Sequence, residues 1–527
     1  MRKNPVFWLG GAVVVGLTLL ALVVVAAPAR SASPAGFVRV ATAAEPKSLD
    51  PHVTTSLEDF RILSNVYEGL VRFAPGTLGV EPALAESWTV SQDGTSLVFR
   101  LRRGVRFHDG TSFDAEAVKF NLERLLDEHH PFHDTGPFPL AFFLDSIREV
   151  TVLDAHRVRL SLNEPFAPLL ANLAYPIGFM VSPAAVKRWG KQFGRHGCGT
   201  GPFAIERWAQ DRAVTLERND HYWAAPAKLE RAEFRTIVDP MTRIAELRAG
   251  GIDVLPEVPA DALGFFRHRA GYGVLSEGGP HVWFLILNTK KAPFDDARAR
   301  RAVNLAVDKQ RIVDRVLEGT ATVAPGAIPA AFGDAHDPGV RPYPHDPERA
   351  KALLAAAGVA PGTELSCLIP KGGSGMLEPE LMATAIQADL AKVGLVLRIR
   401  TWEWNAYLKE VNPGLGSDVD MAAMAWMTND PDTLPYLALR SGALPPKGFN
   451  SGYYRNPRVD ELVEAARREG DPARRSALYR KLDRVVHDDA PWLFVASWKQ
   501  NVVFRERVLG LALDPTFWLR LRGASTR

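Results

Sequence analysis

The chain has 527 residues, 46% of them apolar and 23% charged, which is typical of a globular protein too long for a single hydrophobic core. The formal net charge of +3 comes from Arg2, Lys3 and Arg30, because removing these three from the 63 basic residues leaves 60, against 60 acidic ones. The rest of the chain has no net charge and no run of basic residues, so it lacks the positively charged surface that is typical of nucleic-acid-binding proteins.

Residues 1–32 have the order of a secretory signal, in which a basic start is followed by an apolar run and a small-residue segment. The uncharged run from residue 6 to residue 28 is also long enough to span a bilayer, so an uncleaved membrane anchor stays open beside a removed signal peptide. Both interpretations place the bulk of the chain outside the cytoplasm, and we expect a periplasmic location.

The first elements of the exported part are a strand at residues 37–43 and a β-hairpin between residues 85 and 109. Asp93-Gly94 is the predicted hairpin turn. The alternating apolar residues that follow the turn should face one side, namely Leu97, Phe99 and Leu101. Asp114 then caps a helix with an apolar stripe formed by Val118, Leu122 and Leu125.

Two later helices carry clear start and stop signals. Asp239 and Pro240 begin one helix and Gly250 ends it, and residues 346–358 repeat the same pattern. Between the helices lie apolar strand-like runs at residues 281–288, 364–370, 395–400 and 419–425. From residue 364 onward the order is strand, helix (about 377–393) and strand, so we expect α/β lobes with mixed sheets.

The cysteines, the histidine cluster and the short motifs of the sequence do not form a recognisable catalytic or metal site. Cys198 and Cys367 form no CxxC pair, and two separate buried thiols are favoured over a disulfide. His129, His130 and His133 precede a proline-rich loop, which favours a surface loop over a metal site. Hydrolase motifs such as GxSxG and HExxH are missing, so we expect no catalytic residues and no metal or other cofactor.

Several long blocks in register resemble the extracellular solute-binding proteins, family 5, which serve peptide and nickel ABC importers. The longest block begins "LAESWTVSQDGTSLVFRLRRGVRFHDG" at Leu84 and continues to Arg124. Others are "GTGPFAIERW" from Gly199, "TRIAELRAGGIDV" from Thr242, "LNTKKAPFDDARARRAVNLAVDK" from Leu287, and a final block from Tyr453 to Trp492. The resemblance therefore covers essentially the whole exported chain.

The resemblance implies a two-lobed periplasmic-binding-protein fold of class II, the Venus-flytrap type. Lobe I is expected at residues 33–280, with an extra subdomain at about 60–190. Lobe II is expected at residues 281–495, and residues 496–527 should return to lobe I. Closure of the lobes over a solute by a hinge motion is the implied mechanism.

A polar segment, "WMTNDPDT" from Trp426 to Thr433, follows the last predicted strand. Similar peptide binders place an aspartate three residues after this tryptophan, where it pairs with the α-ammonium of the substrate. Here that position is Asn429, Asp430 is the next candidate anchor, and Asn429, Asp430 and Asp432 are all expected ligand contacts. The alternative is that Asp430 and Asp432 only form a turn with a capping carboxylate.

The carboxylate anchor of some dipeptide binders is altered as well. Its arginine falls at Gly373, and the neighbouring Lys371 offers a point charge instead of a bidentate fork. With both terminal anchors changed, free dipeptides are less favoured than longer or modified peptides or another small polar solute. Aromatic residues are the remaining candidates for ligand contact, namely Tyr67, Trp283, Trp404 and Trp426.

The function implied by the resemblance is the substrate-binding component of an ABC importer, which captures peptides or peptide-like solutes and delivers them to a membrane permease. We expect a monomer that carries the solute without altering it. Two alternatives stay open: a binder of a non-peptide solute such as a metal chelate, an opine or an oligosaccharide, and an anchored sensory receptor with the same fold.

Overall fold

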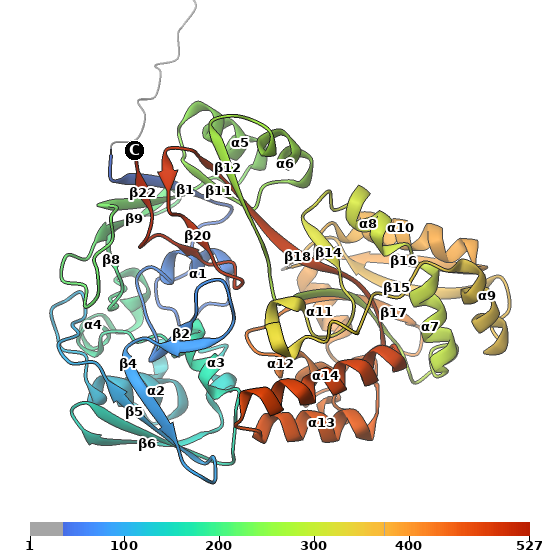
Figure 1. The fold of residues 1–527 in the computed structure, drawn as a ribbon, viewed down its shortest axis with the longest axis horizontal. Coiled ribbons are helices and arrows are strands. Elements are labelled where there is room, and N and C mark those ends of the chain that lie inside the picture. The colour runs from blue at the N-terminus through green and yellow to red at the C-terminus, as the bar shows by residue number, and fades with distance from the viewer. Residues whose placement is uncertain (1–34, 374) are drawn as a thin grey trace, which may run out of the picture.

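The computed structural model describes residues 35–373 and 375–527, so the segment interpreted as a signal peptide or anchor lies outside the described residues. Within the described part, no helix has the length and apolar character needed to cross a membrane. The chain forms two lobes, and Figure 1 shows strands β12 (Tyr272–Gly278) and β18 (Trp492–Arg505) running between them. The expected α/β class with two lobes is confirmed.

One twelve-stranded sheet extends through both lobes in the order β16-β15-β17-β13-β18-β11-β1-β10-β9-β8, and β12 and β14 pair with β18 beside this path. Strand β18 joins the lobes, because its first half pairs with β13 and its second half pairs with β11 and β12. The other strands of the sheet are β1 (Phe37–Thr42), β8 (Phe203–Ala209), β9 (Ala213–Arg218), β10 (Arg231–Thr236), β11 (Val254–Pro256), β13 (His281–Leu287), β14 (Ala321–Val323), β15 (Thr363–Pro370), β16 (Leu395–Trp402) and β17 (Met421–Met427).

Lobe I is built from both ends of the described chain, since Val38 and Val40 share one hydrophobic core with Val508 and Trp518. Its helices are α1 (Leu57–Leu63), α2 (Ala115–Leu126), α3 (Leu169–Ala174), α4 (Pro183–Trp189), α5 (Pro240–Ala249) and α6 (Ala260–Arg267). Short strand pairs complete it: β2 (Val71–Phe73) with β3 (Val80–Pro82), β19 (Val508–Leu509) with β22 (Ser525–Thr526), and β20 (Ala512–Leu513) with β21 (Leu519–Arg520). The domain boundaries given above stay a proposal.

A separate four-stranded sheet, β4-β5-β7-β6, carries the predicted hairpin. Its strands are β4 (Ala85–Val90), β5 (Ser96–Leu101), β6 (Ile147–Asp154) and β7 (Arg157–Leu162). The turn and the inward face of the hairpin are confirmed, because Gly94 has a φ of 72° and the alternating residues Leu97, Phe99 and Leu101 are buried. Helix α2 begins as predicted, since the Asp114 carboxylate accepts a hydrogen bond from the Ala117 N–H at 3.0 Å.

Lobe II contains the predicted β15-α10-β16 unit, in which the two strands pair in parallel. Its helices are α7 (Ala297–Ala306), α8 (Lys309–Arg315), α9 (Pro347–Ala356), α10 (Pro379–Lys392), α11 (Trp404–Val411), α12 (Thr433–Ala438), α13 (Pro457–Arg468) and α14 (Pro472–Asp489). The predicted helix signals are confirmed in both lobes: Asp239 and Asp346 cap α5 and α9 through their side chains, and Gly250 ends α5 in the left-handed region.

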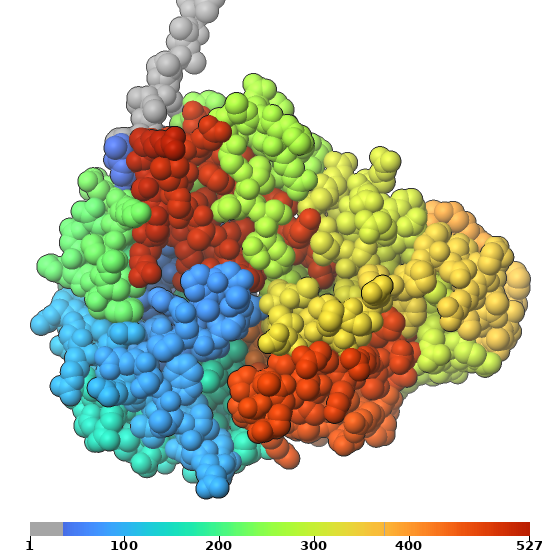
Figure 2. Space-filling model, in the orientation of Figure 1, coloured from blue at the N-terminus to red at the C-terminus, as the bar shows by residue number. Residues whose placement is uncertain are grey.

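The lobes touch along one side of the molecule, where Figure 2 shows the surface of α13 and α14 lying against lobe I. The Ala167 N–H donates a hydrogen bond to the Arg467 carbonyl oxygen at 2.7 Å, and Arg468 pairs with Glu164 at 2.9 Å. The Arg467 guanidinium also lies over the Phe166 ring. These contacts connect segments some 300 residues apart and place the two lobes face to face.

The cysteines and the histidine cluster have structural surroundings. Cys198 and Cys367 are both free and buried, as favoured, and burial raises the pKa of each thiol. His130 packs edge-on against the Phe120 ring, and His133 Nδ1 is 3.0 Å from the Arg124 carbonyl oxygen. Among the described residues there is no group of three or more metal-ligating side chains that could hold an ion.

Candidate functional site

A cavity of about 300 Å³ lies between the lobes. That volume is at the lower end of the range for small-molecule pockets and has room for about ten water molecules. Lobe I contributes Thr55, Leu57, Phe60 and Tyr175 to its lining. The rest of the lining is His281, Phe284, Ile286, Gly375, Trp404, Leu408, Asn412, Met424, Ala425, Trp426, Met427, Ala438, Phe449, Ser451, Trp492 and Trp498.

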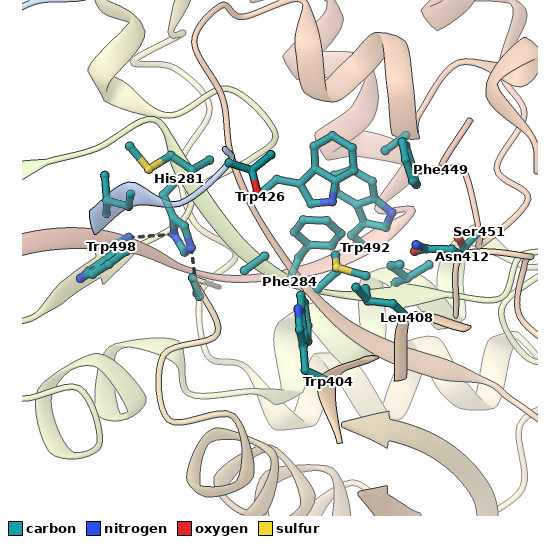
Figure 3. Close-up of a pocket in the computed structure, with 18 of the residues that line it drawn as sticks. His281, Phe284, Trp404, Leu408, Asn412, Trp426, Phe449, Ser451, Trp492 and Trp498 are labelled. Atoms are coloured by element: carbon teal, nitrogen blue, oxygen red, sulfur yellow. Dashed lines mark hydrogen bonds between the residues drawn. The ribbon is translucent and has the colours of Figure 1, made fainter. Parts of the chain in front are cut away.

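The wall of the cavity is mainly aromatic (Figure 3). Phe284 of β13 and Trp492 of β18 stack with their ring centres 3.9 Å apart, and Trp426 of β17 meets Phe449 edge-on at 5.3 Å. Trp404 begins α11 and stacks on Tyr407 one turn later in the same helix. Rings held by neighbouring strands offer a large apolar contact area and lose little rotamer freedom on binding.

Alternation along β13 decides which of its side chains reach the site. Phe284 and Ile286 belong to one hydrophobic core with Val282, whereas Trp283 and Leu285 belong to the core on the opposite face of the sheet. Trp283 is fully buried and does not line the cavity. On this strand the aromatic residue that lines the cavity is therefore Phe284, the neighbour of the expected Trp283.

His281 lines the cavity, and both of its ring nitrogens make hydrogen bonds to backbone groups. Nδ1 accepts a hydrogen bond from the Trp498 N–H at 3.1 Å, so the proton is on Nε2, which donates to the Gly375 carbonyl oxygen at 3.0 Å. Burial lowers the pKa of His281 to about 4. The imidazole is thus neutral at pH 7 and joins β13, β18 and the loop that carries Gly375.

The expected anchor Asp430 is part of an internal ion pair. Both of its carboxylate oxygens accept from Arg475, at 2.6 and 3.0 Å, and Oδ1 also accepts from the Asp432 N–H at 2.8 Å. Asp432 pairs in turn with Arg467 at 2.6 Å. Both aspartates are buried, and neither lines the cavity. Arginines from α13 and α14 occupy both carboxylates in this structure, and a ligand contact from either aspartate stays a prediction.

Two further expected contacts lie away from the cavity. Asn429 is buried at the lobe contact, where its amide donates to Asn172 Oδ1 of α3 in lobe I at 2.8 Å. Tyr67 is buried inside lobe I, and its hydroxyl donates to the Leu49 carbonyl oxygen at 2.6 Å. Both side chains have protein partners that a ligand would have to displace.

The loop that follows β15 also differs from expectation. Lys371 is largely exposed and pairs with Glu403 at 3.2 Å, outside the cavity lining. Gly373 has no room for a side chain, because a Cβ there would lie 2.4 Å from Cε3 of Trp404. The Trp404 indole occupies the space that a longer residue at position 373 would need. Trp404 and Trp426 are the expected contacts that the structure does bring to the cavity.

Comparison with known proteins identifies the family of this two-lobed fold. Residues 79–444 match the model of the bacterial extracellular solute-binding proteins, family 5. The chain belongs to this family. Family-5 relatives include di/tripeptide-binding protein 2 of Pseudomonas aeruginosa, which is 33% identical over 94% of this chain and 96% of its own length. Heme-binding protein A of Haemophilus influenzae is 32% identical over 92% of this chain and 91% of its own length.

Solved structures of family-5 proteins have the same architecture. HbpA2 from Haemophilus parasuis superposes with a TM-score of 0.86 at 28% identity, covering 93% of this chain and 100% of the other. The periplasmic binding protein DppA from Helicobacter pylori, solved in complex with the peptide STSA, gives a TM-score of 0.75 at 29% identity, covering 93% and 98%. Family and fold therefore agree over nearly the whole described chain.

Several lining residues of this family-5 protein were not among the expected contacts. Phe60 and Tyr175 come from lobe I, Phe449 from a loop after α12, and Trp492 from β18. The period-2 pattern of β13 could have pointed to Phe284, since its neighbour Trp283 must face the other way. The remaining positions carry no local signal, because they meet only when distant segments pair.

Proposed function

We propose that this protein is the solute-binding component of an ABC importer, which captures a peptide or peptide-like solute between its lobes and delivers it to a membrane permease. The observation that carries the proposal is the cavity with aromatic walls that both lobes line. The names of the relatives support it, since they include di/tripeptide-binding and dipeptide-binding proteins. So does a dipeptide-binding protein solved with Met-Leu, which is 26% identical to this chain with a TM-score of 0.77.

Capture would occur by rotation of the lobes about the segments that connect them. Strands β12 and β18 lie at the crossing, so small backbone changes there would open the cavity to solvent. Closing brings Asn429 against Asn172 and Arg468 against Glu164, and it surrounds the solute with aromatic rings. The protein acts as a monomer and releases the solute chemically unchanged, so it is not an enzyme.

The proposed site of action is the periplasm, after export directed by the N-terminal segment. Whether that segment is removed or retained as an anchor is decided by sequencing the N-terminus of the mature protein. A cleaved form supports a diffusing carrier. A retained segment favours the alternative of an anchored receptor with the same fold.

A screen of melting temperatures tests solute capture. Di- to pentapeptides, opines, nickel chelates and oligosaccharides are added to the purified protein, and a ligand present at about 100 times its Kd should stabilise the folded state by about 2.7 kcal/mol. Binding should also change tryptophan fluorescence, because Trp404, Trp426, Trp492 and Trp498 line the cavity. If the whole screen leaves the melting temperature unchanged, the proposal fails.

Matched variants connect the binding signal to the cavity. Trp426→Ala removes a wall of the site and should weaken binding of any ligand found by the screen by at least tenfold. Trp402→Ala is the control, since this tryptophan of β16 is partly buried in the same lobe but does not line the cavity. Equal losses for the two variants would place the ligand elsewhere.

A non-peptide solute is the second candidate, and one observation favours it. Among the described residues, the lining of the cavity contains no carboxylate, lysine or arginine, and its one imidazole, His281, is uncharged at pH 7. Capture of an oligosaccharide or another uncharged solute, with no peptide bound in the same screen, would decide for this candidate.

A further inference from the structure

The cavity between the lobes is electrically neutral throughout its described lining. None of the residues that surround it is Asp, Glu, Lys or Arg, although charged residues make up 23% of the chain. The one imidazole, His281, has both nitrogens bonded to backbone groups, and burial keeps it uncharged. A charged ligand group placed here would find no counter-ion.

The charged residues that follow Trp426 in the sequence are bound to arginines of α13 and α14. Asp430 is held by two contacts from Arg475, and Asp432 is held by Arg467. Arg475 donates a further hydrogen bond to the Tyr479 hydroxyl. Each carboxylate and guanidinium therefore has a partner of opposite charge, and recruiting one of them to a ligand would leave the other buried without a partner.

The hydroxyl and amide side chains of the lining are Thr55, Tyr175, Asn412 and Ser451, and none of them makes a side-chain hydrogen bond to another described residue. Asn412 and Ser451 line the cavity side by side at the end opposite to His281 (Figure 3). Ser451 is only 2% exposed, and its hydroxyl has no hydrogen-bond partner among the described residues. The Asn412 amide likewise has no side-chain bond within the described part of the chain. A hydroxyl that lines the cavity and is not bonded to the protein is free to meet a ligand's neutral donor or acceptor.

We propose that this cavity selects an uncharged apolar or aromatic group with one or two hydrogen-bonding atoms, as in a blocked or cyclic peptide, and excludes a free terminal ammonium or carboxylate. The inference rests on the proposed function and specifies the solute class. Taking an ion out of water without a partner is far more costly than burying a neutral amide that gains a hydrogen bond. Asn412 and Ser451 supply that bond.

Charged parts of a larger solute have a separate place. A groove of about 770 Å³ shares Asn412 and Phe449 with the cavity and continues outward between the lobes. Its lining includes Asp145 and Lys447, so it offers both signs of charge. Phe142 from lobe I and Phe449 from lobe II are exposed in this groove. A ligand would thus bury its neutral end and leave charged groups at the groove.

A matched series of ligands tests the inference. Leu-Phe is prepared as the free zwitterion, as the cationic amide, as the anionic N-acetyl acid, as the neutral N-acetyl amide and as the cyclic dipeptide. Binding to the full protein is measured by isothermal titration calorimetry. We expect the two neutral forms to bind at least tenfold more tightly than the cationic amide. We also expect the free zwitterion to bind more weakly than the N-acetyl acid, which is its counterpart without an ammonium group.

An isosteric charge inserted in the cavity provides the reverse test. Asn412→Asp should raise the affinity for the cationic amide relative to the neutral N-acetyl amide by at least tenfold. Asn405→Asp is the matched control, because Asn405 lies in α11, the helix that Asn412 caps at its C-terminal end, but is exposed and outside the lining. Ser451→Ala should weaken the neutral forms by about two- to tenfold, the size of one lost hydrogen bond.

The outcomes separate this inference from the proposed function. A free dipeptide that binds as tightly as its blocked form overturns the neutral selection and leaves peptide capture standing. If Asn405→Asp shifts the charge preference as much as Asn412→Asp does, the cavity is not the origin of the preference and the inference fails. If no member of the series binds, the inference is overturned, and the wider screen decides separately whether the protein captures a solute.

Discussion

Replacing Asp430 by Asn distinguishes a ligand anchor from a structural ion pair. The Asp430 carboxylate is 4% exposed and the Arg475 side chain 16%, and two contacts of 2.6 and 3.0 Å join them. Removing one partner of such a buried pair costs about 3–5 kcal/mol, because the other charge stays buried. Asp432 is a second anion near Arg475 and offsets part of the loss, so we expect about 3 kcal/mol.

That loss should be visible as a change in melting temperature. For a unit of about 150–250 residues, the size of lobe II, each kcal/mol shifts the melting temperature by about 2–4 °C, so Asp430→Asn should lower it by about 6–12 °C. Differential scanning calorimetry measures this shift. Asp488→Asn is the control on the same lobe, since its carboxylate is 78% exposed and the change should stay within about 0.5 kcal/mol.

The affinity of the folded variant decides the role of the residue. Measured well below the melting temperature with the tightest ligand from the screen, the Kd of Asp430→Asn should stay within about threefold of the unmodified protein, because Asp430 does not line the cavity. A loss of affinity of tenfold or more with an unchanged melting temperature would refute this reasoning and restore Asp430 as a ligand anchor.

Three other perturbations test separate parts of the structure. Gly373→Ala would place a Cβ 2.4 Å from the Trp404 ring and should lower ligand affinity by about tenfold in calorimetric titration, whereas Gly372→Ala, which meets no atom within 4 Å, should not. His281 has a pKa of about 4 in the folded state, below the unfolded value of about 6.5, so it contributes a loss of stability as pH falls through this window, and its share between pH 7 and pH 5 should be about 2 kcal/mol. Buried His52 and His108 have the same lowered pKa of about 4 and keep their own shares, so in denaturant titrations His281→Asn should reduce the total loss by about 2 kcal/mol, while exposed His221→Asn leaves it unchanged. Glu164→Arg turns an exposed interlobe attraction to Arg468 into a repulsion of at most about 1 kcal/mol, so ligand affinity should fall less than about fivefold at low salt and recover at high salt.

Local patterns in the sequence predicted much of the fold because their physics is local. The Asp93-Gly94 turn, the Asp114 cap and the Gly250 stop each depend on residues within one turn of themselves. The parallel pairing of β15 with β16 followed from the helix between them. These elements need no knowledge of distant segments.

The site was less accessible to sequence reasoning because its chemistry depends on long-range pairing. Asp430 has the residue type and position of an anchor, but its partner Arg475 is 45 residues away on another element. Tyr67 is an aromatic residue in an apolar segment, and only the fold shows that its hydroxyl meets Leu49 inside lobe I. Trp426 directly follows the apolar run predicted as a strand, whereas the Phe449 ring packed against it comes from a loop.

The polar segment after Trp426 connects the ligand cavity to the contact between the lobes. Asn429 bonds to Asn172 of lobe I, and Asp432 orients Arg467, whose guanidinium lies over the Phe166 ring. Because a ligand binds the closed form in preference to the open form, any contact that stabilises closure raises ligand affinity by the same free energy. With a cavity that offers no charge, the polar interactions of closure are supplied by the protein itself, and the solute contributes mainly apolar contact area. Affinity for neutral solutes should therefore depend on the lobe contact as well as on the aromatic wall.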